Sequence, residues 1–158
     1  VRFLDLPNQE LDQIPLLKII KEIEKEIFET KASIIFTHHY NDLNLDHRVA
    51  YEATITAARP IPDSKVSSII SFEIPAATDW RKPYKFNPNL YIDISSQLTA
   101  KINALKAYQY EFRKPPHPRS KEITDAVAKR WGSLSGFKAA EAFEIIFSRM
   151  NNLENISL

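Results

Sequence analysis

Short apolar segments recur along the first two thirds of the chain and predict strands. They are rich in β-branched and aromatic residues and lie at Arg2–Leu6, Ser33–Thr37, Ser67–Glu73 and Leu90–Ile94. The segment Ser33–Thr37 is apolar through its middle rather than alternating, which is typical of a strand buried on both faces of a parallel sheet.

Helical periodicity predicts helices between and after these strands. The apolar residues that recur on one face of the first helix, which follows Asp12 and Pro15, are Leu16, Ile20, Ile23 and Ile27. Further helices are expected at about His47–Arg59, after Ser95 and Ser96, at about Ser120–Arg130 and at about Lys138–Met150. In the last of them, the buried face is expected to hold Ala139, Phe143, Ile146 and Met150.

Alternating strands and helices imply right-handed βαβ crossovers. The expected fold class is therefore α/β, a Rossmann-like and mostly parallel sheet flanked by helices. A length of 158 residues fits one domain, 1–158, with 151–158 as a loose tail. The chain opens at Val1 inside a predicted strand, so we expect a domain truncated at its N-terminus.

Composition narrows the possible functions. The 21 basic and 20 acidic residues are interspersed and leave a net charge of +1, which argues against a surface for nucleic acid or an anionic membrane. The apolar runs are only a few residues long, so no membrane span is expected. The chain has no cysteine, so a metal would be held by His, Asp or Glu, and a cytoplasmic location is favoured.

Polar residues gather after the predicted strand Ser33–Thr37, where parallel sheets carry their functional groups. Three of the four histidines, two aspartates and two asparagines lie between His38 and His47. His47 opens a predicted helix directly after Asp46, which could cap that helix or support a metal-binding imidazole. Ordinary loop and capping residues would give the same composition, and the spacing makes no self-contained zinc site.

The order of motifs resembles the PIG-L/LmbE-like (GlcNAc-PI de-N-acetylase) family. Its second signature is matched by Asn41–Arg48, read NDLNLDHR, followed by Ala57-Ala58-Arg59-Pro60. Further matches follow the family's order: Val1–Pro7, Ser71–Pro75, Thr78–Trp80, Tyr91–Ser95, Lys106–Tyr108, His117–Ser120, Gly136 and Ala140–Phe143. The resemblance covers nearly the whole chain and corresponds to the C-terminal two-thirds of the family's domain.

The resemblance implies a hydrolase that uses Zn²⁺ or another divalent ion to remove an N-acetyl group from an amino-sugar-type substrate. In the family, a His-Pro-Asp-Asp-Glu motif supplies two metal ligands and the general base, and the His of a later Asp-His pair supplies the third ligand. That histidine is His47 here. The resemblance also makes Asp46 and Asn44 catalytic candidates, Asn44 standing where some members carry a histidine.

Four residues are candidates for substrate binding: His38, Asp42, His117 and Arg119, the last two in a loop stiffened by prolines. The sequence does not say which of His38 and His39 faces the site. Thr78, Asp79 and Trp80 follow a predicted strand and could form a sugar-contacting rim, and Trp80 could equally serve packing.

No His-Pro-Asp-Asp-Glu motif occurs in this sequence. The chain is therefore expected to supply one metal ligand and part of the substrate site. We also expect it to form a homo-oligomer or to pair with a missing N-terminal segment. The alternative is a non-catalytic fragment that acts at most as a binding or oligomerisation module.

Overall fold

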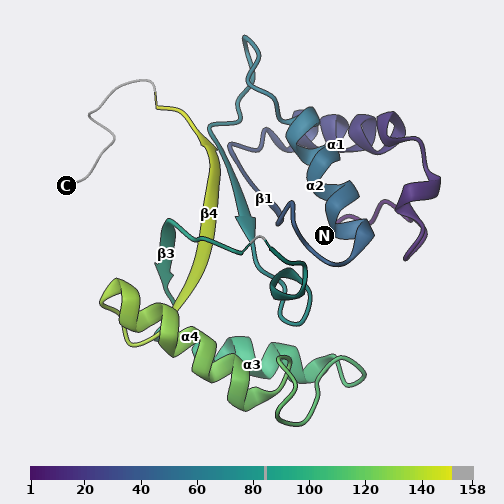
Figure 1. The fold of residues 1–158 in the computed structure, drawn as a ribbon. Helices are drawn as coiled ribbons and strands as arrows, with labels where there is room; N and C mark the ends of the chain where they lie inside the picture. The colour runs from purple at the N-terminus through teal and green to yellow at the C-terminus, as the bar shows by residue number, and fades with distance from the viewer. Residues whose placement is uncertain (84, 151–158) are drawn as a thin grey trace.

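The computed structural model describes residues 1–83 and 85–150 and shows one sheet flanked by helices (Figure 1). The strands are β1 (Ile34–His38), β2 (Ser68–Phe72), β3 (Leu90–Asp93) and β4 (Ala140–Ser148). The α-helices are α1 (Leu16–Thr30), α2 (Leu45–Ala57), α3 (Leu98–Ala107) and α4 (Lys121–Ser135). Two short 3-10 helices are η1 (Leu11–Gln13) and η2 (Thr78–Trp80). The expected tail 151–158 lies outside the described residues.

The strand order β1-β2-β4-β3 places three carboxyl ends at one edge of the sheet. β1 pairs with β2 in parallel, whereas β4 is antiparallel to both β2 and β3. β1, β2 and β3 therefore run in the same direction, and β4 runs against them. The expected α/β class is confirmed, with one antiparallel strand inside the sheet.

The prediction of a helix at Lys138–Met150 is wrong, because most of this segment forms β4. The strand pairs along both of its sides, and Ala140 and Ala142 are buried while Glu141 between them is not. A register shift places one extra residue, Ile146, between two consecutive pairs with β2. This bulge interrupts the alternation of a strand and leaves an apolar spacing that resembles a helix.

The prediction of a strand at Arg2–Leu6 is also wrong, since this segment has no regular structure. Asp5 has a φ of 50°, which breaks an extended run. Arg2 instead forms ion pairs with Glu26 and Glu29 of α1, and Leu6 packs against the apolar core of α1 and α2.

Helices α1 and α2 pack on each other and form one apolar core, while α4 packs against β4. Ala53 of α2 is fully buried against Ile19 and Ile20. At α4, a Cβ on Gly132 would lie 2.7 Å from the carbonyl oxygen of Phe137, so only glycine allows this close approach.

Apolar side chains are exposed on the end strand β1 and on helix α3. Ile34 and Phe36 of the end strand β1 are about half exposed, at 52% and 48%. Leu105 of α3 is also exposed, whereas Ile102 of the same helix is buried. No helix in the part of the chain that the structure describes is long and apolar enough to cross a membrane.

Candidate functional site

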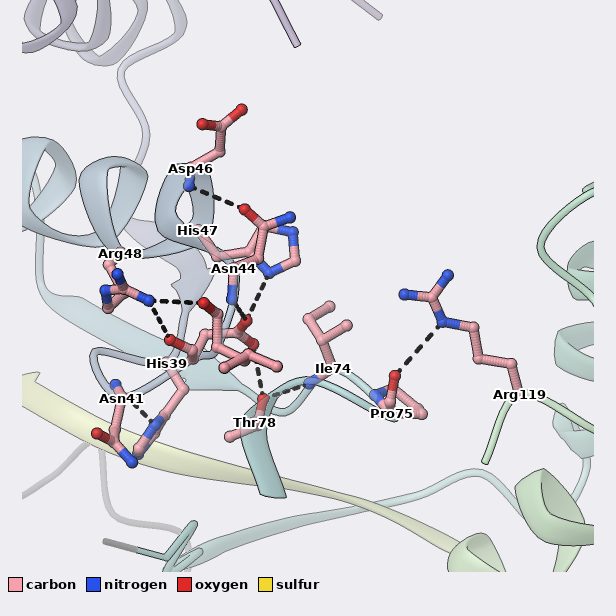
Figure 2. A network of polar contacts seen from close by, with 12 residues as sticks. His39, Asn41, Asn44, Asp46, His47, Arg48, Ile74, Pro75, Thr78 and Arg119 are labelled. Carbon is pink, nitrogen blue, oxygen red and sulfur yellow. Dashed lines mark hydrogen bonds and ion pairs between the residues drawn. The ribbon is translucent and has the colours of Figure 1, made fainter. Parts of the chain in front are cut away.

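The polar network of Figure 2 lies where β1 and β2 end. His38 is the last residue of β1, and Asn44 and His47 lie at the start of α2. The loop after β2 supplies Ile74, Pro75 and Thr78. The site is therefore built from two loops at the edge that collects carboxyl ends, as expected for an α/β sheet.

A buried carboxylate holds the candidate metal ligand His47. Asp42 is fully buried, and its Oδ1 lies 3.0 Å from Nδ1 of His47. The same oxygen accepts the backbone N–H of Asn44 at 2.8 Å. The ring of His47 is 22% exposed, and Nδ1 is the nitrogen that faces the carboxylate, so Nε2 is the one left for another partner. Metal-binding histidines are commonly held in this way.

The loop after β2 supports Asp42 from its other side. Oγ1 of Thr78 donates to Oδ2 of Asp42 at 2.9 Å and accepts the backbone N–H of Ile74 at 2.8 Å. Thr78 is 1% exposed, so it does not form a sugar-contacting rim. The loop turns at Ala76, whose φ of 71° is in the left-handed region.

His38, and not His39, lies beside His47. The rings of His38 and His47 stack with centroids 4.2 Å apart and planes at 16°. Burial, reinforced by the neighbouring His47, lowers the pKa of His38 to about 4. His38 is therefore neutral near pH 7 and can offer an uncharged imidazole to the site.

His39 is fully buried and engaged elsewhere. Its Nδ1 accepts the backbone N–H of Asn41, and its Nε2 lies 3.2 Å from Oε2 of Glu144 on β4. Burial by itself would raise the pKa of Glu144, but hydrogen bonds from His39 and from the backbone of Asn87 hold that pKa below its usual value. His39 is thus part of the fold's interior.

Asp46 and Asn44 make different contacts at the start of α2, and those of Asp46 differ from the expected ones. The Asp46 carboxylate accepts the backbone N–H groups of Gln9 and Leu11, at 2.7 and 3.1 Å. The N-cap of α2 is Asn44, whose side-chain oxygen accepts the N–H of Asp46. The residue beside His47 is Asp42, so Asp46 is neither the helix cap nor the partner of the candidate ligand.

Arg119 reaches the same β2 loop from the chain segment before α4 (Figure 2). Its Nε donates to the carbonyl oxygen of Pro75 at 3.4 Å, and its guanidinium forms an ion pair with Glu111. Nδ1 of His117 accepts the backbone N–H of Arg119 at 3.0 Å. The structure thus brings Arg119 to the loop that carries Thr78 and ties His117 to Arg119.

Arg48 is a site residue that the sequence reasoning missed. Its guanidinium donates to the carbonyl oxygens of Asp42 and Leu43, both at 2.7 Å. It therefore fixes the turn that carries Asp42. Its position one residue after His47 in the Asp-His signature is the signal that could have drawn attention to it.

A cavity of about 520 Å³ adjoins this network. Phe72 lines it and lies 5.1 Å, between ring centroids, from His38. Glu73, also in the lining, accepts the indole N–H of Trp131 at 2.7 Å, while burial raises the pKa of its carboxyl. Lys101 and Glu141 add an ion pair of 2.5 Å to otherwise mainly apolar walls. A small, partly apolar group could be held there.

The residues present fit one position of a metal site. That position is Nε2 of His47, the ring nitrogen that does not face Asp42. Within residues 1–83 and 85–150, however, no group of three or more His, Asp and Glu side chains could hold a metal ion. A complete metal site would need ligands from outside this set.

Comparisons with known proteins find a family model that matches the N-terminal part of the chain. Residues 1–58 match the family PIG-L: GlcNAc-PI de-N-acetylase. This match confirms the resemblance seen in the sequence over the region that contains the Asp-His pair.

Solved structures share the fold over most of the chain. The conserved protein TT1542 from Thermus thermophilus matches 96% of this chain with a TM-score of 0.69 and 16% identity. The N,N'-diacetylchitobiose deacetylase from Pyrococcus horikoshii matches 97%, with a TM-score of 0.67 and 17% identity. The hydratase GalB, the 4-carboxy-2-hydroxymuconate hydratase from Pseudomonas putida, matches 89%, with a TM-score of 0.65 and 17% identity.

This chain spans 68%, 61% and 62% of the lengths of those three proteins, in the same order. At such identities the likeness shows a shared α/β fold alone.

Proposed function

We propose that this chain, whose residues 1–58 match the PIG-L family, is part of a metal-dependent N-deacetylase for an N-acetylated amino-sugar-type substrate. The observation that carries the proposal is the pairing of His47 with the buried Asp42. In this pairing Nδ1 faces the buried carboxylate, so Nε2 is the nitrogen left to bind a metal at the edge of the sheet where β1 ends. A bound zinc or similar ion would acidify water and polarise the acetamide carbonyl.

Each polar residue of the network then has a distinct task. Asp42 orients His47, and Arg48 holds the turn from which Asp42 projects. His38 presents a neutral imidazole next to His47 and can donate to or accept from the substrate. Asn44 caps α2 through its side-chain oxygen, and its amide NH₂ can donate to a substrate oxygen. His117 and Arg119 border the same loop and are candidates for binding hydroxyl groups.

Further metal ligands would come from outside this chain's described residues. Either an N-terminal segment or a second copy of the chain could provide them. β1 lies at one end of the sheet and exposes Ile34 and Phe36, so its outer side suits an additional strand with an apolar face. This geometry supports both forms of assembly.

A second candidate function is a non-catalytic binding or oligomerisation module. It is favoured by the lack of a three-residue metal group among residues 1–83 and 85–150. The hydratase among the similar structures also means that the fold alone does not select deacetylation.

Zinc retention and acetate release together test the proposal. The wild-type chain should retain more zinc in equilibrium dialysis than His47→Ala. His117→Ala is the control and should match the wild type, because the ring of His117 contacts the backbone of Arg119. Acetate release from N,N'-diacetylchitobiose should require zinc and should be lost in His47→Ala.

Equal zinc retention or equal turnover in His47→Ala would overturn the ligand assignment. A folded wild-type chain that neither retains zinc above the level of His47→Ala nor releases acetate would favour the non-catalytic module.

A further inference from the structure

We propose that Thr78 is a positioning residue for His47, acting through Asp42 to keep the proton of the imidazole on Nδ1 and to leave Nε2 bare. This inference rests on the proposed function only in the assumption that Nε2 of His47 binds the metal. The two hydrogen bonds of Thr78 and the 3.0 Å contact between Asp42 and His47 are present independently of any reaction (Figure 2).

The direction of the hydrogen bonds at Thr78 is fixed by its neighbours. A hydroxyl carries one proton, and Oγ1 of Thr78 already accepts the N–H of Ile74 at 2.8 Å. Its own proton is therefore directed to Oδ2 of Asp42, 2.9 Å away. The hydrogen bonds therefore run from the backbone N–H of Ile74 through the hydroxyl of Thr78 to the carboxylate of Asp42.

Both oxygens of Asp42 are held as a result. Oδ2 receives Thr78, while Oδ1 receives the N–H of Asn44 and faces Nδ1 of His47. Asp42 is fully buried, so bulk water does not replace a partner that is removed. Loss of the hydroxyl would leave a buried carboxylate oxygen unsatisfied and would free the carboxylate to rotate.

The orientation of Asp42 decides the tautomer of His47. A neutral imidazole carries its proton on the nitrogen that has the better acceptor, and here the acceptor lies 3.0 Å from Nδ1. A rotated Asp42 would weaken that contact and allow the proton to move to Nε2, which could then no longer bind a metal.

Thr78 also joins two parts of the sequence. It lies 36 residues from Asp42, in a turn closed by hydrogen bonds from the N–H groups of Ala77 and Thr78 to the carbonyl oxygen of Ile74. The N–H of Leu43 donates to the carbonyl oxygen of Ala77 at 3.3 Å. The β2 loop therefore contacts the β1 loop through backbone and side chain, and its conformation sets the state of His47.

The test compares Thr78→Val, which keeps the shape and loses the hydroxyl, with Thr78→Ser, which keeps the hydroxyl. NMR of the ring nitrogens is recorded on the metal-free chain at about pH 9, where imidazoles are neutral. The His47 signals are assigned from the spectrum of His47→Ala. We expect Nδ1–H in the wild type and in Thr78→Ser, and a mixture of both tautomers in Thr78→Val.

Zinc affinity gives a second readout, with an expected loss of about tenfold in Thr78→Val and recovery in Thr78→Ser. The ring of His117 is an internal control, because its Nδ1 accepts the N–H of Arg119 and its tautomer should not change. If Thr78→Val does not fold, Thr78→Ala provides the same loss of the hydroxyl with less apolar bulk.

An unchanged His47 tautomer together with unchanged zinc affinity in the folded hydroxyl-free variant would overturn the proposal. This outcome is separate from a failure of the proposed function. Acetate release could be absent while Thr78 controls the tautomer, or present while Thr78 does not.

Discussion

Two histidine–carboxylate pairs follow β1, one in the interior of the fold and one at the edge of the sheet. His39 and Glu144 connect the β1 end to β4, and His39 is fully buried with both ring nitrogens engaged. His47 and Asp42 reverse the arrangement, because the carboxylate is fully buried and the imidazole is partly exposed with one nitrogen available. Burial of the imidazole makes the first pair structural, whereas in the second pair a buried carboxylate supports a partly exposed imidazole, the candidate ligand.

The largest expected effect is a difference in the free energy of unfolding when the histidine of each pair is replaced by alanine. His39→Ala leaves Glu144 without its buried partner and should lower the free energy of unfolding by about 3 kcal/mol. His47→Ala should cost about 1 kcal/mol, because water can reach Asp42 once the partly exposed ring is gone. Urea denaturation followed by circular dichroism measures both. Equal losses in the two variants would contradict the division into a structural and a functional pair.

A smaller effect is expected on the free energy of unfolding at acidic pH, where Glu144 becomes protonated. The partners of Glu144 hold its pKa below the unfolded value, so it contributes stability above that value, and this stability is lost as pH falls through the folded pKa. Glu144→Gln should therefore be less stable than wild type near neutral pH and approach it in acid. Denaturation at several pH values tests this, with the exposed Glu52→Gln as control. A gap that stays constant with pH would count against the His39 contact as its cause.

The smallest effect concerns Glu73, which is paired with an indole and not with an imidazole. Burial raises its pKa, so its stabilising form is the neutral one, present below the unfolded pKa and lost as pH rises through the folded pKa. Gln keeps an acceptor for the N–H of Trp131, so Glu73→Gln should gain stability relative to wild type as pH rises above about 4.5. The same series of denaturation curves measures it, and a relative loss with rising pH would refute it.

Local signals in the sequence located much of the fold. β1 was predicted within one residue at each end because its apolar run is bounded by polar residues, and α1 begins where its periodicity begins, at Leu16. Ser120 caps α4 as its position before the helical pattern suggests. The placement of His47 at the start of a helix beyond a strand followed from the same signals.

Long-range partners lay beyond the reach of the sequence. Asp42 depends on Thr78, and Asp46 on Gln9 at a separation of 37 residues, so each carboxylate's role is set by the folded chain. The division between His38 and His39 also depends on Glu144, which lies on a strand that the sequence presented as a helix. The periodicity of β4 misled because a bulge and two pairing neighbours, not its local pattern, determine its conformation.

The position of β4 in the sheet has a consequence for biosynthesis. Although it is the last strand in the described chain, it lies between β2 and β3, and its Ser148 pairs with Ser68 at a separation of 80 residues. The ribosome synthesises β1, β2 and β3 before β4. The edges of β2 and β3 that pair with β4 therefore stay unpaired until β4 has been synthesised. The sheet is complete only after β4 has been synthesised. A nascent chain that stalls before β4 would expose these unpaired edges and would be expected to bind chaperones.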